Sequence, residues 1–79
     1  MIAQARKLAE LSPGESGTVS RILGPAEVRH RLLEMGLTSG TLVRLVRAAP
    51  LGGPVELHLR GYRLGIRKSE AASIFLEGH

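Results

Sequence analysis

Few side chains in this sequence could take part in catalysis or metal binding. The chain has seven Glu and three His, but no Asp and no Cys. Glu56 and His58 are two positions apart in a stretch that alternates apolar and polar residues, so they share one face of an expected strand. They could offer two donors to Fe²⁺ or Zn²⁺, whereas zinc sites usually gather three or four clustered ligands. We therefore expect only a weak metal site, shared with another molecule, and no cofactor.

The motifs of the common enzyme classes are missing. The sequence has no Gly-x-Ser-x-Gly elbow, no Walker lysine loop and no dinucleotide fingerprint. Gly52 and Gly53 are followed by a proline and a strand, whereas a phosphate-binding loop leads its free amides into a helix. Glu56 and His58 have no nucleophile or second carboxylate at a useful spacing. We predict that the protein is not an enzyme.

The charge of the chain favours acidic partners. The formal net charge is +4, from eleven Lys and Arg against seven Glu. Such a balance suits nucleic acid, anionic lipid or an acidic protein face. The basic residues look scattered along the chain, and Tyr62 and Phe75 are the only aromatic residues. Stacking on bases needs aromatic platforms, so this composition disfavours nucleic acid.

The sequence is expected to form one cytoplasmic domain. No run of residues approaches the ~18 consecutive apolar positions of a membrane-spanning helix. The N-terminal MIAQARKLAEL carries charges at Arg6, Lys7 and Glu10 and lacks the apolar centre of a signal peptide. We therefore expect a single domain over residues 1–79, with an ordered core from about residue 8 to about residue 77.

The elements that must position these residues are mainly strands. The pattern predicts strands at residues 17–23, 41–48, 55–61, 62–68 and 73–77. A helix of about ten residues opens at Pro25, and Ser69 caps one helical turn before the last strand. Five short antiparallel strands in so few residues favour a small closed barrel, because closure leaves no exposed edge.

Two of these elements carry specific packing expectations. The helix should bury a stripe made of Val28, Leu32, Leu33 and Met35. The strand at residues 41–48 has apolar residues on both faces, so we expect both faces to be covered. The strand at residues 62–68 should turn Tyr62, Leu64 and Ile66 inward and Arg63 and Arg67 outward.

Turn residues are expected to be structural. Pro13 and Gly14 suit the second and third positions of a β-turn. The sequence LLEMGLTSG predicts a Schellman motif, in which Gly36 takes the left-handed conformation and Leu37 packs on Leu32. Gly40 and Gly61 are expected at further turns, and neither is expected to contact a ligand.

Two surface features are candidates for partner binding. The first is the loop APLGGP at residues 49–54, with Pro50, Leu51, Gly52 and Gly53 as its contact residues. Leu51 is a large apolar residue at a loop tip, where polar residues are usual; the alternative is that it folds back on the end of the barrel. The second is the pair Arg63 and Arg67, expected on one strand face, with a simple solvated charged face as the alternative.

Four motifs together resemble one family. In order they are L-x-x-L-x-P-G-E-x-G-x-V, R-x-R-L-L-E-M-G-L-x-x-G, A-P-L-G-x-P and L-x-I-R-x-x-E-A-x-x-I, from Leu8 to about Leu76. This order is similar to FeoA, the small accessory protein of bacterial ferrous iron uptake. Ser39, Gly53 and Gly65 depart from the residues common in similar sequences, and none of them is an expected core position.

The resemblance implies a fold and a partner. The fold would be an SH3-like five-stranded barrel with one helix inserted after the first strand and a short helical turn before the last. The partner would be FeoB, a ferrous iron permease with a GTP-hydrolysing cytoplasmic domain, whose Fe²⁺ transport the protein would support or regulate. The alternative is a regulatory or nucleic-acid-binding barrel resembling the C-terminal module of iron-dependent repressors. Activation, assembly and inhibition of transport stay open, as does homo-oligomerisation.

Overall fold

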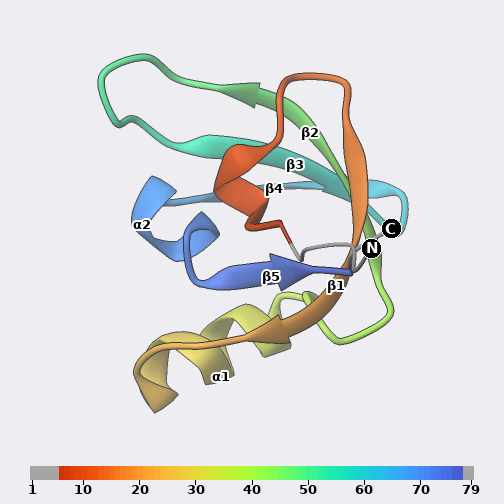
Figure 1. Cartoon of the computed structure of the whole chain (residues 1–79), viewed down its shortest axis with the longest axis vertical. Coiled ribbons are helices and arrows are strands. Elements are labelled where there is room, and N and C mark those ends of the chain that lie inside the picture. The colour runs from red at the N-terminus through yellow and green to blue at the C-terminus, as the bar shows by residue number, and fades with distance from the viewer. Residues whose placement is uncertain (1–5, 78–79) are drawn as a thin grey trace, which may run out of the picture.

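Residues 6–77 fold into five strands, two α-helices and one 3₁₀ turn. The computed structural model describes residues 6–77. In chain order the elements are η1 (Leu8–Glu10), β1 (Ser16–Ile22), α1 (Ala26–Glu34), β2 (Leu42–Ala48), β3 (Val55–Leu59), β4 (Tyr62–Ile66), α2 (Lys68–Ala71) and β5 (Ile74–Leu76). Figure 1 shows the sheet curling around the core, with α1 at one end and the β2–β3 hairpin projecting at the other. The mainly β fold with a helix inserted after the first strand is confirmed.

All strand pairs are antiparallel, in the order β4-β3-β2-β1-β5. β1 is shared between two partners, since Ser16–Thr18 pair with β2 and Val19–Ile22 pair with β5. β4 and β5 end the sheet and do not pair with each other; α2 connects them (Figure 1). The curled sheet is therefore joined at this side by a helical turn and not by strand pairing.

The core follows the alternation of the strands. Val19, Leu45 and Leu57 are among its fully or almost fully buried side chains, and Leu57 pairs directly with Leu45 on one side and Leu64 on the other. From the N-terminal segment, η1 adds Leu8, which is completely buried. Burial of each such side chain contributes roughly 1.5–3 kcal/mol before conformational entropy is subtracted.

The helix stop at Gly36 is the Schellman motif expected from the sequence. The Leu37 amide donates to the Leu32 carbonyl at 3.1 Å, and the Gly36 amide donates to the Leu33 carbonyl at 3.0 Å. Gly36 has φ +102°, and both Leu32 and Leu37 are completely buried. The space beside Gly36 is also full, because an added Cβ would lie 2.5 Å from the Tyr62 hydroxyl oxygen.

The turn at Pro13 and Gly14 is also confirmed. The Glu15 amide donates to the Ser12 carbonyl at 2.9 Å, and Gly14 takes φ +92°. The Glu15 carboxylate in turn accepts a hydrogen bond of 2.7 Å from the Ser12 amide. This hydrogen bond, together with Arg6, lowers the pKa of Glu15 below its usual value.

Several packing expectations are wrong. Leu33 is 37% exposed, so the buried stripe of α1 is narrower than the sequence indicated. Leu42 is 62% exposed, so β2 is covered on one face only. Tyr62 is 40% exposed, although its hydroxyl donates to the Met35 carbonyl at the end of α1. Ser69 is not the cap of α2: Arg67 is, and its amide donates to the Glu70 carboxylate at 2.8 Å.

A salt bridge ties the inserted helix to α2. Arg31 of α1 pairs with the Glu70 carboxylate, which is almost completely buried. The bridge brings α1 against the short helix that joins β4 to β5. Neither helix among residues 6–77 is long and apolar enough to span a membrane.

Candidate partner-binding surface

The tip of the β2–β3 hairpin is a tight turn of unusual composition. The Gly53 amide donates to the Pro50 carbonyl at 3.3 Å, which closes a four-residue turn. Its two central residues, Leu51 and Gly52, have φ +59° and +77°. Two positive φ angles in succession define a type I′ turn, where Asn-Gly is the usual pair. Below the turn, the Ala49 amide donates to the Pro54 carbonyl at 2.9 Å and extends the hairpin.

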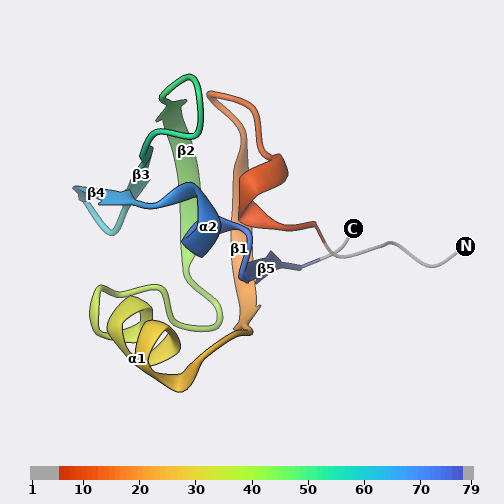
Figure 2. The ribbon, with the colours of Figure 1, turned by 90° about the vertical axis from the view of Figure 1, so that its left-hand side faces the viewer.

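Leu51 is both strained and fully exposed. The left-handed conformation raises the energy of a non-glycine residue by roughly 1–2 kcal/mol. The Leu51 side chain does not offset this strain by burial, since its relative exposure is 104%. The alternative that Leu51 folds back on the barrel is therefore wrong. Strained residues persist where the surrounding structure holds them, and they cluster at functional sites. In both views the tip stands away from α1, at the opposite end of the molecule (Figure 2).

The outer face of β2, β3 and β4 gathers basic side chains. We call the following set the basic face: Arg44, Arg47, Glu56, His58 and Arg63. Strand register aligns Arg44, His58 and Arg63 in one row, because Arg44 pairs with His58 and His58 pairs with Arg63. Basic residues that are scattered along the sequence thus become neighbours in the folded sheet.

A β-bulge places Arg47 on this face. Strict alternation would put Arg47 on the buried side with Leu45, but the register shifts between these two residues, leaving Val46 as the extra residue. Arg47 then pairs with Glu56 across the strands. Bulges of this kind re-aim side chains at the edges of binding sites, and alternation alone could not have predicted the position of Arg47.

The Glu56 carboxylate forms salt bridges with two arginines. Its Oε2 accepts from Arg63 Nη1 at 3.0 Å, and its Oε1 lies 3.5 Å from Arg47 Nε. Both oxygens that a metal ion would need are therefore engaged, and the surrounding guanidinium groups repel a cation. No cluster of three or more His, Cys, Asp or Glu suited to a metal occurs within residues 6–77. The arrangement favours binding of an anionic surface over binding of Fe²⁺ or Zn²⁺.

Arg63 and Arg67 are not one patch. Arg63 belongs to the basic face, whereas Arg67 lies beyond the end of β4 as the cap of α2. Arg67 lines a different hollow, together with Pro25, Val28 and Arg31. The expectation that both arginines lie outward on one strand is therefore wrong, and only Arg63 lies near the other candidate residues.

A hollow lies beside the base of the β2–β3 hairpin, next to the basic face. A depression of about 280 Å³ is lined by Ala49 and Pro54 at the hairpin base and by Arg47, Glu56 and Arg63 of the basic face. Gly65, which pairs with Glu56, has open space where a side chain would stand. The hollow therefore lies between the base of the hairpin and the basic face.

A sequence model of the FeoA domain matches residues 6–78. This chain belongs to the FeoA family. The resemblance inferred from the four motifs is thus confirmed. Three of these motifs build the frame of a FeoA domain, namely the turn at Pro13, the Schellman motif at Gly36 and the Glu70 contact that caps α2. The fourth, A-P-L-G-x-P, forms the exposed tip at Leu51, where it stabilises no core.

One relative is a fusion of Fe(2+) transport protein A with the Fe(2+) transporter FeoB. The Fe(2+) transport protein A/Fe(2+) transporter FeoB fusion protein of Porphyromonas gingivalis (strain ATCC BAA-308 / W83) is 35% identical over 71 residues, 90% of this chain. The chain spans 8% of the length of that relative. In that protein, a FeoA-like segment and a FeoB transporter are parts of one polypeptide.

Solved FeoA structures share the fold. The FeoA-like protein from Clostridium acetobutylicum is 36% identical, with a TM-score of 0.84 over 99% of this chain and 90% of that one. Stenotrophomonas maltophilia FeoA, solved in complex with zinc and described as a prokaryotic SH3 domain protein, is 30% identical, with a TM-score of 0.79 over 92% and 91% of the two chains. The SH3-like architecture expected for this FeoA chain is confirmed.

Proposed function

We propose that this protein is a non-catalytic accessory module of bacterial ferrous iron uptake that docks on a FeoB-like permease at its cytoplasmic side. Membership of the FeoA family supports the role in ferrous iron transport. The fusion of a FeoA-like segment to a FeoB transporter in the P. gingivalis relative supports the choice of partner. Docking then supports or regulates Fe²⁺ transport.

The observation that carries the docking proposal is Leu51. A fully exposed aliphatic side chain on a strained left-handed backbone adds nothing to the stability of the isolated chain. Its burial against a partner would gain roughly 1.5–3 kcal/mol. The turn is already closed by the Gly53 amide before any partner arrives, so little conformational entropy is lost on binding.

The basic face supports an acidic partner surface. The face carries Arg44, Arg47, Arg63 and His58 but one carboxylate, that of Glu56, which pairs with Arg47 and Arg63. Charges on such a face raise the rate of encounter with an acidic surface and orient the tip, more than they raise affinity. We assign Arg63 to this contact and leave Arg67 out of it, since Arg67 caps α2.

Nucleic acid fits the same charge less well. Both aromatic residues already have contacts: Tyr62 donates to the Met35 carbonyl, and Phe75 lies under Lys7 and Arg21 at 5.9 and 5.6 Å. Neither belongs to the basic face, so that face offers no platform on which bases could stack. A protein partner remains the better proposal.

Iron uptake in cells tests the function. A strain that lacks this gene should take up less radioactive Fe²⁺ or, if the protein inhibits transport, more; wild-type protein should restore the normal rate. Leu51→Asp should fail to do so while accumulating to the same level as the wild type. Full complementation by Leu51→Asp would contradict the proposed use of the tip, and unchanged uptake in the deletion strain would contradict the function itself.

A further inference from the structure

A second concave surface lies at the other end of β2 from the Leu51 tip. It is a groove of about 620 Å³ where β1, β2 and β3 meet, and it includes the start of β2 and the turn after β3. Its lining residues that matter for binding are Ser16, Thr41, Leu42, Arg44, His58 and Arg60. Among residues 6–77, no carboxylate lines the groove.

The two arginines of the groove carry uncompensated charge. Within residues 6–77, the salt bridges join Arg6, Arg31, Arg47 and Arg63 to carboxylates, and none involves Arg44 or Arg60. His58 lies directly across the strands from Arg44. Two positive groups without a counter-charge, in one concave surface, favour an anionic ligand.

Arg60 is held in place before any ligand arrives. It has φ +47° in the two-residue turn between β3 and β4, with Gly61 next at +83°. Its Nη2 donates to Thr41 Oγ1 at 2.9 Å and lies 3.4 Å from Thr38 Oγ1. Thr41 is almost fully buried. A guanidinium has five N–H donors, so the Nε and Nη1 donors stay available for an oxyanion without loss of this anchor.

An apolar residue lies among these charges. Leu42 is 62% exposed and lines the groove next to Arg44. An inorganic oxyanion would gain nothing from contact with the Leu42 side chain, and a flat membrane surface would not enter a concave groove. A peptide segment with an aliphatic side chain beside a carboxylate matches both features.

We propose that the groove binds an acidic peptide segment of a protein partner, with a carboxylate on Arg44 and Arg60 and a neighbouring aliphatic side chain on Leu42. This inference goes beyond docking through the hairpin tip, because the groove lies at the other end of β2 from the tip and shares only Arg44 and His58 with the basic face. It also needs no permease for its test, so its failure leaves the proposed function standing.

The test is an NMR titration of the ¹⁵N-labelled full chain with the peptide acetyl-Glu-Leu-Glu-Glu-Leu-amide. Shifts should concentrate at Thr41, Leu42, Arg44 and Arg60, and affinity should fall as salt is added, since exposed charges are screened. A peptide with Gln in place of every Glu should bind at least about tenfold more weakly, the loss expected for one charge-assisted contact.

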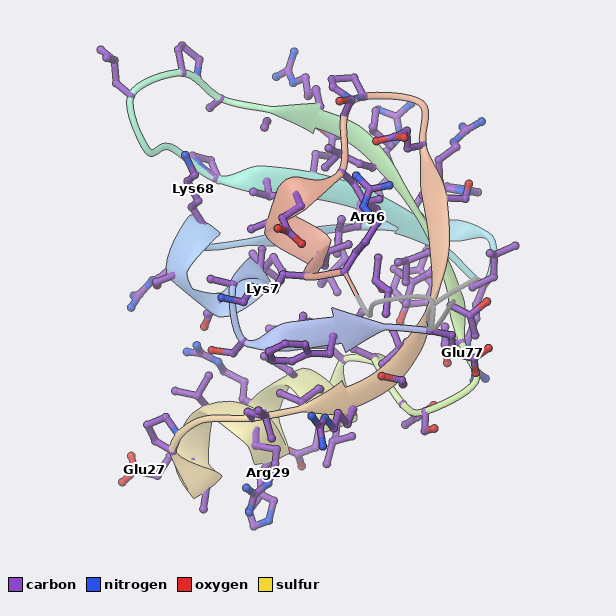
Figure 3. The ribbon with its side chains drawn as sticks, viewed as in Figure 1. Arg6, Lys7, Glu27, Arg29, Lys68 and Glu77 are labelled. Carbon is purple, nitrogen blue, oxygen red and sulfur yellow. The ribbon has the colours of Figure 1, made fainter. Side chains whose placement is uncertain are left out.

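Two variants and one control localise the site. Arg44→Gln and Leu42→Ser change exposed residues, so both should fold, and each should weaken peptide binding about fivefold or more. Arg29→Gln removes the same charge from α1 (Figure 3) and should leave binding unchanged. Equal binding of the wild type and Arg44→Gln would overturn the proposal.

Competing occupants give distinct results that would also overturn it. Inorganic phosphate that causes the same shifts at the same concentration would make the groove a simple oxyanion site. Stronger binding to phosphatidylglycerol vesicles than to the peptide would make it a lipid-binding surface. Concentration-dependent sedimentation that disappears in Arg44→Gln would show that a second copy of the chain occupies the groove.

Discussion

Substitution of Leu51 by asparagine should make the protein more stable. The Leu51 side chain is fully exposed, so its removal sacrifices no buried area, and the effect on the free energy of unfolding comes from the backbone alone. At φ +59° leucine is strained by roughly 1–2 kcal/mol, whereas asparagine before glycine is favoured in a type I′ turn. Leu51→Asn should therefore stabilise the fold by about 0.5–1 kcal/mol.

Thermal unfolding followed by circular dichroism measures this effect. For a domain of this size, 1 kcal/mol shifts Tm by roughly 4–8 °C, so we expect a rise of about 2–8 °C. Leu51→Val is the matched control, because a β-branched side chain resists positive φ, and its Tm should fall. If Leu51→Asn melts at or below the wild-type temperature, or if Leu51→Val melts above it, the strained turn is not the conformation in solution.

Three further predictions concern the frame that supports the surface. Gly36→Val should lower the free energy of unfolding, measured by chemical denaturation, by more than about 1 kcal/mol, because φ is +102° and the new Cβ would meet the Tyr62 hydroxyl. An unfolding midpoint equal to that of the wild type would refute the Schellman motif at Gly36. Arg31→Gln should cost about 1–3 kcal/mol, since it leaves the buried Glu70 carboxylate without its charge partner; a double-mutant cycle with Glu70→Gln that shows no coupling would argue against the bridge. The pKa of the Glu15 carboxyl, measured by NMR, should lie below its usual value. Its contribution to stability is therefore present above the pKa of Glu15 in the unfolded chain and is lost as pH falls through the pKa in the folded protein. An ordinary pKa would exclude the hydrogen bond to the Ser12 amide.

Local sequence signals predicted the frame well. The Schellman motif at Gly36 and the turn at Pro13 depend on residues that are close in the sequence, and both were correct. The strands with clean alternation, such as β3 with buried Val55, Leu57 and Leu59, were also assigned correctly. In each case one short segment contains all the information that its conformation needs.

The surface depended on information that no single segment contains. The row from Arg44 to Arg63 exists only once the strands are in register, and Arg47 joins its face through a bulge that the sequence does not mark. Leu42 is a typical buried strand residue by type, but no element among residues 6–77 covers its face, and it is 62% exposed. The alternation of apolar and polar residues predicts that Arg67 belongs to the fourth strand. In the structure β4 ends at Ile66, one residue earlier, because the Arg67 amide donates to the Glu70 carboxylate and caps α2.

The most direct test of the central claim is the affinity of the purified protein for the cytoplasmic domain of the FeoB-like permease, measured by biolayer interferometry. Wild type and Leu51→Met should bind alike, since methionine is apolar and close to leucine in volume. Leu51→Asn should bind about tenfold more weakly or worse, the loss expected when one buried leucine side chain is removed from an interface, despite its higher stability. Equal affinity of the wild type and Leu51→Asn would contradict docking through the hairpin tip.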